Sequence, residues 1–430
     1  MNDYIKIYDK RNRLKTFLMA LSALLISLLA ILAFSSCVYD DYEPSTEAFK
    51  GDTFINLSVI TSGTAENHEA SAKGTRTKDD ENPANPTSES NIHSIRVWVF
   101  DSESTNDNAI AIGYRKEILP QPVNGESEMH SVSIQLLRNA IKQDNQHLDL
   151  YVLANAESIG TTSLNGKDIS FTDGMDEKTL TRQQLKELVI KSQFGITDEG
   201  KPQIQAVPST GLPLSRVITR ISVSNHVADT EMGAAAKAIT VPLVRAVSKL
   251  HFFFARKANA STENIEVTKI EINEQTLPLE SRVFPTEAVE GTTESEGLIG
   301  YIPNDAPYIE KKMLLNGVSN SNIREVANPG SLKRGDNETA ANYMKRLYSA
   351  TNECNLSYLR ESNKPLSGTI FYKLNDSSEE KKATFNIPLS YRNTEMVVYG
   401  YFLDGGTAEV KLKYFVTAWN EKEETNIDFN

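Results

Sequence analysis

Runs of alternating apolar and polar residues recur along most of this chain. The first run, residues 53–61, carries Ile55, Leu57 and Val59 on one side, and the positions between them are Asn56, Ser58 and Ile60. A period of two residues predicts a β-strand with one face toward a core. Comparable runs predict strands at residues 110–114, 132–137, 148–153, 217–225, 239–254, 265–272, 368–374, 382–389, 396–402 and 409–418.

Residues 95–100 differ from these runs because both sides are bulky. Ile95, Val97 and Val99 alternate with Arg96, Trp98 and Phe100. This pattern predicts a strand in the middle of a sheet, with both faces buried. Trp98 is accordingly interpreted as a core residue, as is Trp419, and not as a platform for a ligand.

Helical signals are few. Thr181 and Gln184 fit a capping box at the start of a helix predicted over residues 182–191, with an apolar face of Leu185, Leu188 and Val189. Residues 292–361 are polar, show little periodicity and resemble helix and loop. Many short strands with few helices predict a mostly β fold, organised as two β-sandwich domains in tandem with one or two short helices.

The N-terminal segment has the layout of a secretory signal peptide, predicted over residues 1–36. Five basic residues precede an uncharged apolar run at residues 17–34, which ends at small residues and Cys37. A cysteine at this place is typical of a bacterial lipoprotein, in which acyl chains such as palmitate on the cysteine hold the protein to a membrane. The alternative is an uncleaved transmembrane anchor, because roughly eighteen apolar residues can just span a bilayer.

A polar linker follows the first predicted strand. Residues 62–91 are rich in Ser, Thr, Asn, Gly and Pro, and they contain a basic site around Arg76 that a trypsin-like protease would cut. We therefore divide the rest of the chain into a lipid-anchored propeptide with a removable first strand (37–76), an N-terminal β-sandwich domain (77–245) and a C-terminal β-sandwich domain (246–430).

Charge and chemistry narrow the function. The net charge is −12, and residues 1–36 contribute +3, which leaves −15 for the rest. This negative charge argues against nucleic acid as a partner.

The chain has two cysteines, so lipidation of Cys37 leaves Cys354 without a disulfide partner. Cys354 is therefore expected to be a small buried or half-buried residue. No histidines stand at metal-binding spacing, and no phosphate loop or nucleophile elbow is present. We expect a mechanical or recognition protein, with no enzymatic activity, no metal and no cofactor.

The order of anchor, lone strand, cleavable linker and β-domain suggests how the chain would work. Cleavage after Arg76 would free the first strand to leave, and the sheet edges that it exposes are costly in water. A second subunit can repair them by adding its own strand. Repeated head to tail, such a contact builds a filament.

The chain resembles the FimA and Mfa family of Bacteroidetes fimbrial subunits, the lipoprotein pilins of type V pili. The resemblance is carried by the leader that ends at Cys37 and by residues 95–101 (IRVWVFD), 150–155 (LYVLAN), 241–250 (VPLVRAVSKL), 391–393 (YRN) and 410–419 (VKLKYFVTAW). It implies transthyretin-like domains, a place in a fimbrium on the outer membrane and cell surface, and a role in cell adhesion. The implied partners are other fimbrial subunits, the outer membrane through the lipid, and a host glycan or protein.

The resemblance also implies roles for individual residues. Cleavage would fall between Arg76 and Thr77, and polymerisation would proceed by donor-strand exchange. The removable strand would contribute Ile55, Leu57 and Val59, and the donor segment would contribute Val416, Ala418, Ile427 and Phe429. Residues 420–426 are wholly polar, so two alternatives stay open: a non-polymerising anchor or tip subunit, and a surface glycan-binding lipoprotein with exposed aromatic platforms.

The mature N-terminus distinguishes these hypotheses. In material sheared from the surface of the native cell, we expect the chain in high-mass assemblies, beginning at Thr77, because cleavage after Arg76 releases the first strand. N-terminal sequencing of that material is the measurement. A chain that begins at a lipidated Cys37 would contradict polymerisation and favour an anchor subunit or a glycan-binding lipoprotein.

Overall fold

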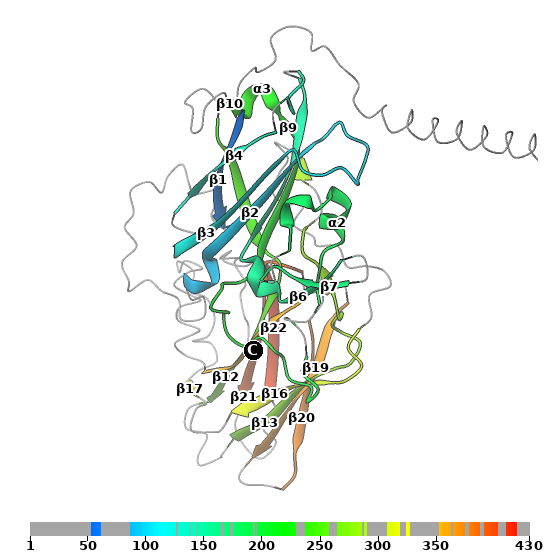
Figure 1. Cartoon of the computed structure of the whole chain (residues 1–430). Helices are drawn as coiled ribbons and strands as arrows, with labels where there is room; N and C mark the ends of the chain where they lie inside the picture. Colours follow the sequence, from blue (N-terminus) through cyan, green and yellow to red (C-terminus); the bar gives the residue numbers. More distant parts are fainter. Residues whose placement is uncertain are drawn as a thin grey trace, which may run out of the picture. The chain divides into compact units, whose positions relative to one another are not determined.

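β-Strands dominate the structure (Figure 1). The computed structural model describes residues 53–61, 87–125, 128–137, 139–143, 145–164, 167–172, 175–191, 194, 196–228, 237–257, 265–285, 288–289, 308–318, 324–326, 352–362, 364–374, 378–387, 391–402 and 410–418. They all fall in the unit Phe49–Asn430. The helical elements among them are short: η3 (Thr87–Ser90), η4 (Ala156–Ile159), η5 (Glu177–Thr179), α2 (Arg182–Glu187) and α3 (Val223–His226). The mostly β fold with short helices is therefore confirmed, whereas the predicted signal peptide lies outside the described residues.

Nine strands form one sheet, and all of them except β15 precede residue 246. Its members are β1 (Phe54–Thr61), β2 (Asn91–Asp101), β3 (Gly113–Asn124), β4 (His130–Gln135), β5 (His147–Ala154), β9 (Leu214–Ser222), β10 (Val227–Ala228), β11 (Ile239–Arg245) and β15 (Ala288–Val289). The main path runs β4-β1-β11-β9-β5-β2-β3. A β-bridge between Gly113 and Leu136 joins β3 back to the end of β4, so the seven strands of this path close into a ring.

The inside of the ring is a hydrophobic core. Alternate residues of every strand on the path except β3 contribute to it, as the period of two predicts, and Ile112 and Leu119 of the β3 region pack against it. The two faces of β2 face two different cores: Ile95, Val97 and Val99 lie inside the ring, whereas Trp98 and Phe100 belong to a separate cluster. The predicted central position of β2, between β3 and β5, is confirmed.

The second half of the chain forms two facing sheets. One contains β12 (Ser248–Lys257), β17 (Arg324–Val326), β18 (Asn352–Leu359), β21 (Thr394–Phe402) and β22 (Val410–Ala418). The other contains β13 (Ile265–Ile272), β16 (Met313–Val318), β19 (Leu366–Leu374) and β20 (Lys381–Ile387). Side chains from both sheets, among them Phe252, Ile270 and Val398, share one core. This is the arrangement of a β-sandwich.

Strand pairing crosses the predicted domain boundary at residue 245. β14 (Ser281–Arg282) pairs with β8 (Val189–Ile190), and β15 pairs with β9. A further hairpin, β6 (Thr161–Leu164) with β7 (Lys167–Ser170), lies near the cluster that contains Trp98. The boundary between residues 245 and 246 stays a prediction.

Four predicted elements need correction. The strand expected over residues 217–225 ends at Ser222, because Val223–His226 form α3. The helix after Thr181 has the capping box but ends at Glu187, because Leu188 has extended dihedral angles and Val189 pairs in β8. The single strand expected over residues 239–254 is two strands, since the chain bends at Ala246 and Val247 between β11 and β12. The described parts of residues 292–361 include strands β16, β17 and β18 in place of the expected helix and loop. These strands form because β13 and β12 supply the hydrogen-bonding edge, which local periodicity does not reveal.

A buried histidine predicts how stability depends on pH. His251 of β12 is fully buried and stacks on Phe253 with 5.5 Å between ring centroids. Burial, assisted by the charge of Lys249 and partly offset by Glu395, lowers the pKa of His251 to about 3. Since its ordinary pKa is 6.5, the unfolded chain binds the proton more readily between pH 6.5 and 3.

Stability should therefore be complete above pH 6.5 and decrease as the pH falls through this window, by at most about 1.4 kcal/mol per pH unit. Urea unfolding at pH 7 and pH 5 measures the difference. His251→Phe, which retains a stacked ring, should remove most of this contribution. An equal loss of stability in wild type and variant would contradict the assignment.

Candidate functional site

The predicted removable strand, β1, is itself one of the strands of the ring, with a hydrogen-bonded strand on each side. It pairs antiparallel with β4 from Phe54 opposite Gln135 to Val59 opposite His130. On its other side it pairs parallel with β11 over residues 57–61, and its first two residues also pair with β10. Figure 1 shows β1, in dark blue, between these strands of later sequence. Removal of β1 would open the ring between β4 and β11.

The inward side chains of β1 are part of the ring's core. Ile55, Leu57 and Val59 are 0%, 1% and 0% exposed, and residues from β2, β4, β5, β9 and β11 surround them. Burial of one such side chain stabilises by about 1.5–3 kcal/mol. The three together therefore contribute on the order of 5–9 kcal/mol, before the backbone hydrogen bonds are counted. The ring depends on a strand in this place.

The outward face of β1 departs from the alternation that the sequence predicts. Ile60 is 1% exposed and Asn56 is 7% exposed, although both occupy the face away from the core of the ring. β1 is thus buried on both faces over most of its length. The expectation of a core face was correct, whereas the period of two does not reveal what covers the second side of a sheet.

Both ends of β1 are fixed by backbone contacts. The amide of Leu136 donates to the Thr53 carbonyl, and the amide of Thr61 donates to the Gly125 carbonyl, each at 2.9 Å. The Thr61 hydroxyl donates to the Ser90 carbonyl at 3.3 Å. A Cβ at residue 125 would lie 2.2 Å from the Thr61 hydroxyl oxygen, so only glycine allows this approach. These contacts determine the register of the strand that fills the ring.

A buried ionic cluster secures η3, the element that directly follows the linker. The Glu89 carboxylate accepts from Lys249 Nζ at 2.8 and 3.0 Å and from the Tyr358 hydroxyl, and Glu89 and Lys249 are at most 1% exposed. Arg245 donates to the Glu89 carbonyl at 3.2 Å and to the Ser90 hydroxyl at 2.6 Å. Hydrogen bonds to β11, β12 and β18 therefore hold η3 in place. None of these contacts involves β1.

Sequence reasoning missed this cluster. Arg245 and Lys249 interrupt an otherwise apolar run, and buried cations need an anionic or acceptor partner. That signal could have predicted a buried ion pair near residues 241–250. Glu89 could not have been chosen as its partner, because it lies about 160 residues earlier, in the polar stretch that the composition assigns to the linker.

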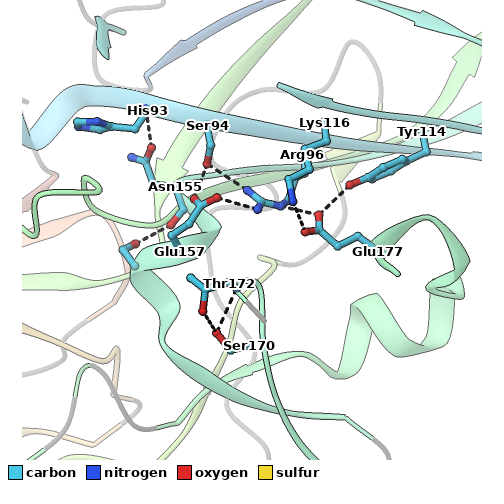
Figure 2. A network of polar contacts seen from close by, with 11 residues as sticks. His93, Ser94, Arg96, Tyr114, Lys116, Asn155, Glu157, Ser170, Thr172 and Glu177 are labelled. Atoms are coloured by element: carbon cyan, nitrogen blue, oxygen red, sulfur yellow. Dashed lines mark hydrogen bonds and ion pairs between the residues drawn. The ribbon is translucent and has the colours of Figure 1, made fainter. Parts of the chain in front are cut away.

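A second ionic cluster joins β2 to η4 and η5 (Figure 2). Arg96 is fully buried; its Nη2 donates to Glu157 at 2.7 Å and its Nε donates to Glu177 at 2.6 Å. Glu177 also accepts from the Tyr114 hydroxyl and from Lys116 Nζ, each at 2.7 Å. Two carboxylates therefore balance one arginine and one lysine.

The electrostatics of this cluster indicate a structural role. Burial alone would raise the pKa of Glu157, but hydrogen bonds from Arg96 and Ser94 keep it below its ordinary value. Burial and the Glu177 carboxylate raise the pKa of Tyr114. At neutral pH Glu157 is therefore ionised and pairs with Arg96, and Tyr114 is protonated and donates its hydrogen bond to Glu177. The cluster fixes two 3-10 helices against the outer face of the ring.

Other residues of the predicted site fall in two groups. Val416 and Ala418 lie in β22, opposite Met396 and Thr394 of β21, so both belong to the chain's own sheet. The following lie outside the described residues: Cys37, Arg76, Thr77, Trp419, Ile427 and Phe429. Trp98, interpreted as a core residue, is fully buried and donates to the Glu177 carbonyl at 2.7 Å.

Three further features of the described residues bear on function. They contain no group of three or more His, Cys, Asp or Glu side chains able to hold a metal ion. No helix in the described parts is long and apolar enough to span a membrane. The exposed large hydrophobic residues in the same ranges are Ile110, Ile118, Met129, Leu137 and Leu279. None of these five is aromatic.

Comparisons with known proteins give structural neighbours only. No protein-family model and no curated protein matches the chain. A candidate cell adhesion protein from Parabacteroides distasonis has 13% identity and a TM-score of 0.47, over 86% of this chain and 98% of that one. The tip fimbrial protein Mfa3 from Porphyromonas gingivalis, truncated at its C-terminus, has 12% identity and a TM-score of 0.43, over 86% and 100%.

The fimbrial anchor protein Mfa2 from Porphyromonas gingivalis has 10% identity and a TM-score of 0.33, over 85% of this chain and 97% of that one. At these identities the likeness concerns the fold. The names of these three neighbours describe cell-adhesion and fimbrial proteins.

The Glu89 cluster yields a prediction about stability. Glu89→Ala leaves the buried Lys249 ammonium without its carboxylate, and breaking a buried pair in this way typically costs about 3–5 kcal/mol. Urea unfolding should report a loss of this size. The double variant Glu89→Leu/Lys249→Met, which removes both charges, should recover most of it. A single variant within about 1 kcal/mol of wild type would show that the pair does not support the fold.

Proposed function

We propose that this chain is a structural fimbrial subunit of the bacterial outer membrane, anchored through a lipid on Cys37, that serves cell adhesion. The observation that carries the proposal is the place of β1. This strand supplies core residues to a ring formed by later strands, and the stretch that joins it to those strands, residues 62–86, contains the predicted cleavage site at Arg76. One cut in a polar linker would thus separate a core strand from its fold.

Maturation would follow from this arrangement. Cleavage after Arg76 leaves residues 53–61 with the lipid-anchored propeptide and the remainder with the body. The Glu89 cluster would hold η3 and the start of β2 in the body, because its contacts to Lys249, Arg245 and Tyr358 are independent of β1. Departure of β1 exposes the apolar interior between β4 and β11, which is costly in water until another strand fills it.

The donor of that strand would be the C-terminus of a neighbouring subunit. β22 ends at Ala418 and is paired within its own sheet, so residues beyond 418 would supply the insertion. Among them, Ile427, Asp428 and Phe429 repeat the apolar-polar-apolar order of Ile55, Asn56 and Leu57. Because donor and groove are different surfaces, the contact repeats head to tail and forms a filament with other fimbrial subunits. A host glycan or protein would be the ligand of the assembled fimbrium.

A non-polymerising anchor or tip subunit is the second candidate. It is favoured by the tight burial of β1 on both faces and by the polar residues 420–426, which offer no apolar side chain to a neighbour's groove. Such a subunit would keep β1 and end a fibre.

Cleavage and polymerisation can be tested together in the native cell. Arg76→Ala should leave the propeptide attached and abolish the multimers that resist denaturing gels without boiling, because β1 stays covalently linked. Lys78→Ala changes a basic residue of the same linker and should affect neither property. Multimers of normal size in the Arg76→Ala variant would contradict the proposal.

A chain truncated after Asn420 tests the role of the donor segment independently of the role of the groove. We expect normal cleavage at Arg76 but loss of homopolymers, since the groove persists and the donor is missing. Unchanged multimers would exclude the C-terminal residues as donor. A wild type that stays monomeric in the native cell would favour the anchor or tip subunit.

A further inference from the structure

One rung of the ladder between β1 and β4 carries two polar side chains in a buried position. Asn56 lies directly opposite Ser133, and Asn56 is 7% exposed. The Oδ1 atom of Asn56 and the Oγ atom of Ser133 are both buried, and neither has a hydrogen-bond partner in the described structure. Polar atoms without partners are among the more costly defects of a protein interior.

The neighbouring rungs do not share this defect. Ile55 faces Ile134, and Leu57 faces Val132, with all four side chains in the core of the ring. The next rung on the polar face joins Ser58 to Ser131, and Ser131 is exposed to solvent. Within the ladder between β1 and β4, the defect is therefore confined to the Asn56–Ser133 rung.

The cost of this rung falls only on the state in which β1 is seated. When β1 leaves the ring, the amide of Asn56 and the hydroxyl of Ser133 both reach water and form hydrogen bonds there. The apolar residues of β1 act in the opposite direction, because they lose their burial. The polar rung thus offsets part of the stabilisation that Ile55, Leu57 and Val59 provide.

We propose that the Asn56–Ser133 rung is a built-in weakness that makes β1 the exchangeable strand of the ring. It lowers the free energy needed to lift β1 out, without weakening the remaining strands. It also sets a preference for the replacement: a strand from a second copy that places a hydrogen-bonding partner for Ser133 Oγ, or no polar atom, at this rung binds more tightly than β1. The use of this weakness in assembly rests on the proposed function; the weakness itself does not.

Hydrogen exchange measured by mass spectrometry on the full exported chain tests the weakness. Asn56→Val removes the unpartnered Oδ1 atom and introduces a side chain that favours strands, and Ser133→Ala removes the hydroxyl. In each variant we expect the amides of residues 54–61 to exchange more slowly, by about tenfold for Asn56→Val. Amides of β12 and β21, which do not contact the rung, should exchange as in wild type.

Ser131→Ala is the matched control, since it removes a hydroxyl from the same strand and face at an exposed position, and should leave exchange of β1 unchanged. Exchange of β1 at the wild-type rate or faster in both Asn56→Val and Ser133→Ala would overturn the proposal. If Asn56→Val does not fold, Ser133→Ala decides by the same criterion, because it only removes one buried atom.

Assembly provides a separate readout. Asn56→Val should be cleaved after Arg76 like wild type but form fewer multimers, since β1 leaves less readily. Slower exchange of β1 in a protein whose wild type forms no multimers would support the weakness and refute polymerisation by strand exchange, so the two failures are distinguishable.

Discussion

The insertion of β1 between β4 and β11 is the interaction on which the N-terminal part of this structure depends. Without β1, β4 and β11 would each lose a pairing partner, and the side chains of the ring enclose a core that β1 helps to fill. A ring of strands has no free edge, which is why it is stable, and loss of one member creates two edges at once. The same fact makes the ring suitable for strand exchange, because the open state strongly favours any strand of matching pattern.

Buried ion pairs fix the positions of segments that are distant in the sequence. The Glu89 cluster fixes the chain where the linker ends, and Arg392 donates to Glu361 and to the carbonyls of Arg282 and Val283 in a similar buried position. Isolated charges are very costly in such places, so each requires its partner in a defined geometry. These pairs therefore specify how distant segments meet, whereas the apolar clusters supply most of the stabilisation.

Buried polar side chains in the ladder between β1 and β4 differ from the buried ion pairs in lacking partners among the described residues. Around Glu89 and Arg96 the charges are matched by opposite charges, which stabilises one arrangement. Asn56 and Ser133 lack such partners in the described structure. Because both atoms reach water when β1 leaves, their cost makes the ladder between β1 and β4 easier to open.

Alternation along the chain was enough to predict the mostly β fold, the burial of Ile55, Leu57 and Val59, and the central position of β2, because a strand with a buried face must repeat every two residues. The capping box at Thr181 could also be predicted from the sequence, since it is a contact between residues three positions apart. Only the tertiary structure decided that β1 lies within a ring, that Glu89 meets Lys249 and that Asn56 faces Ser133. Each of these depends on the pairing of segments far apart in the sequence, and a local pattern records which residues prefer burial but not which partners they meet.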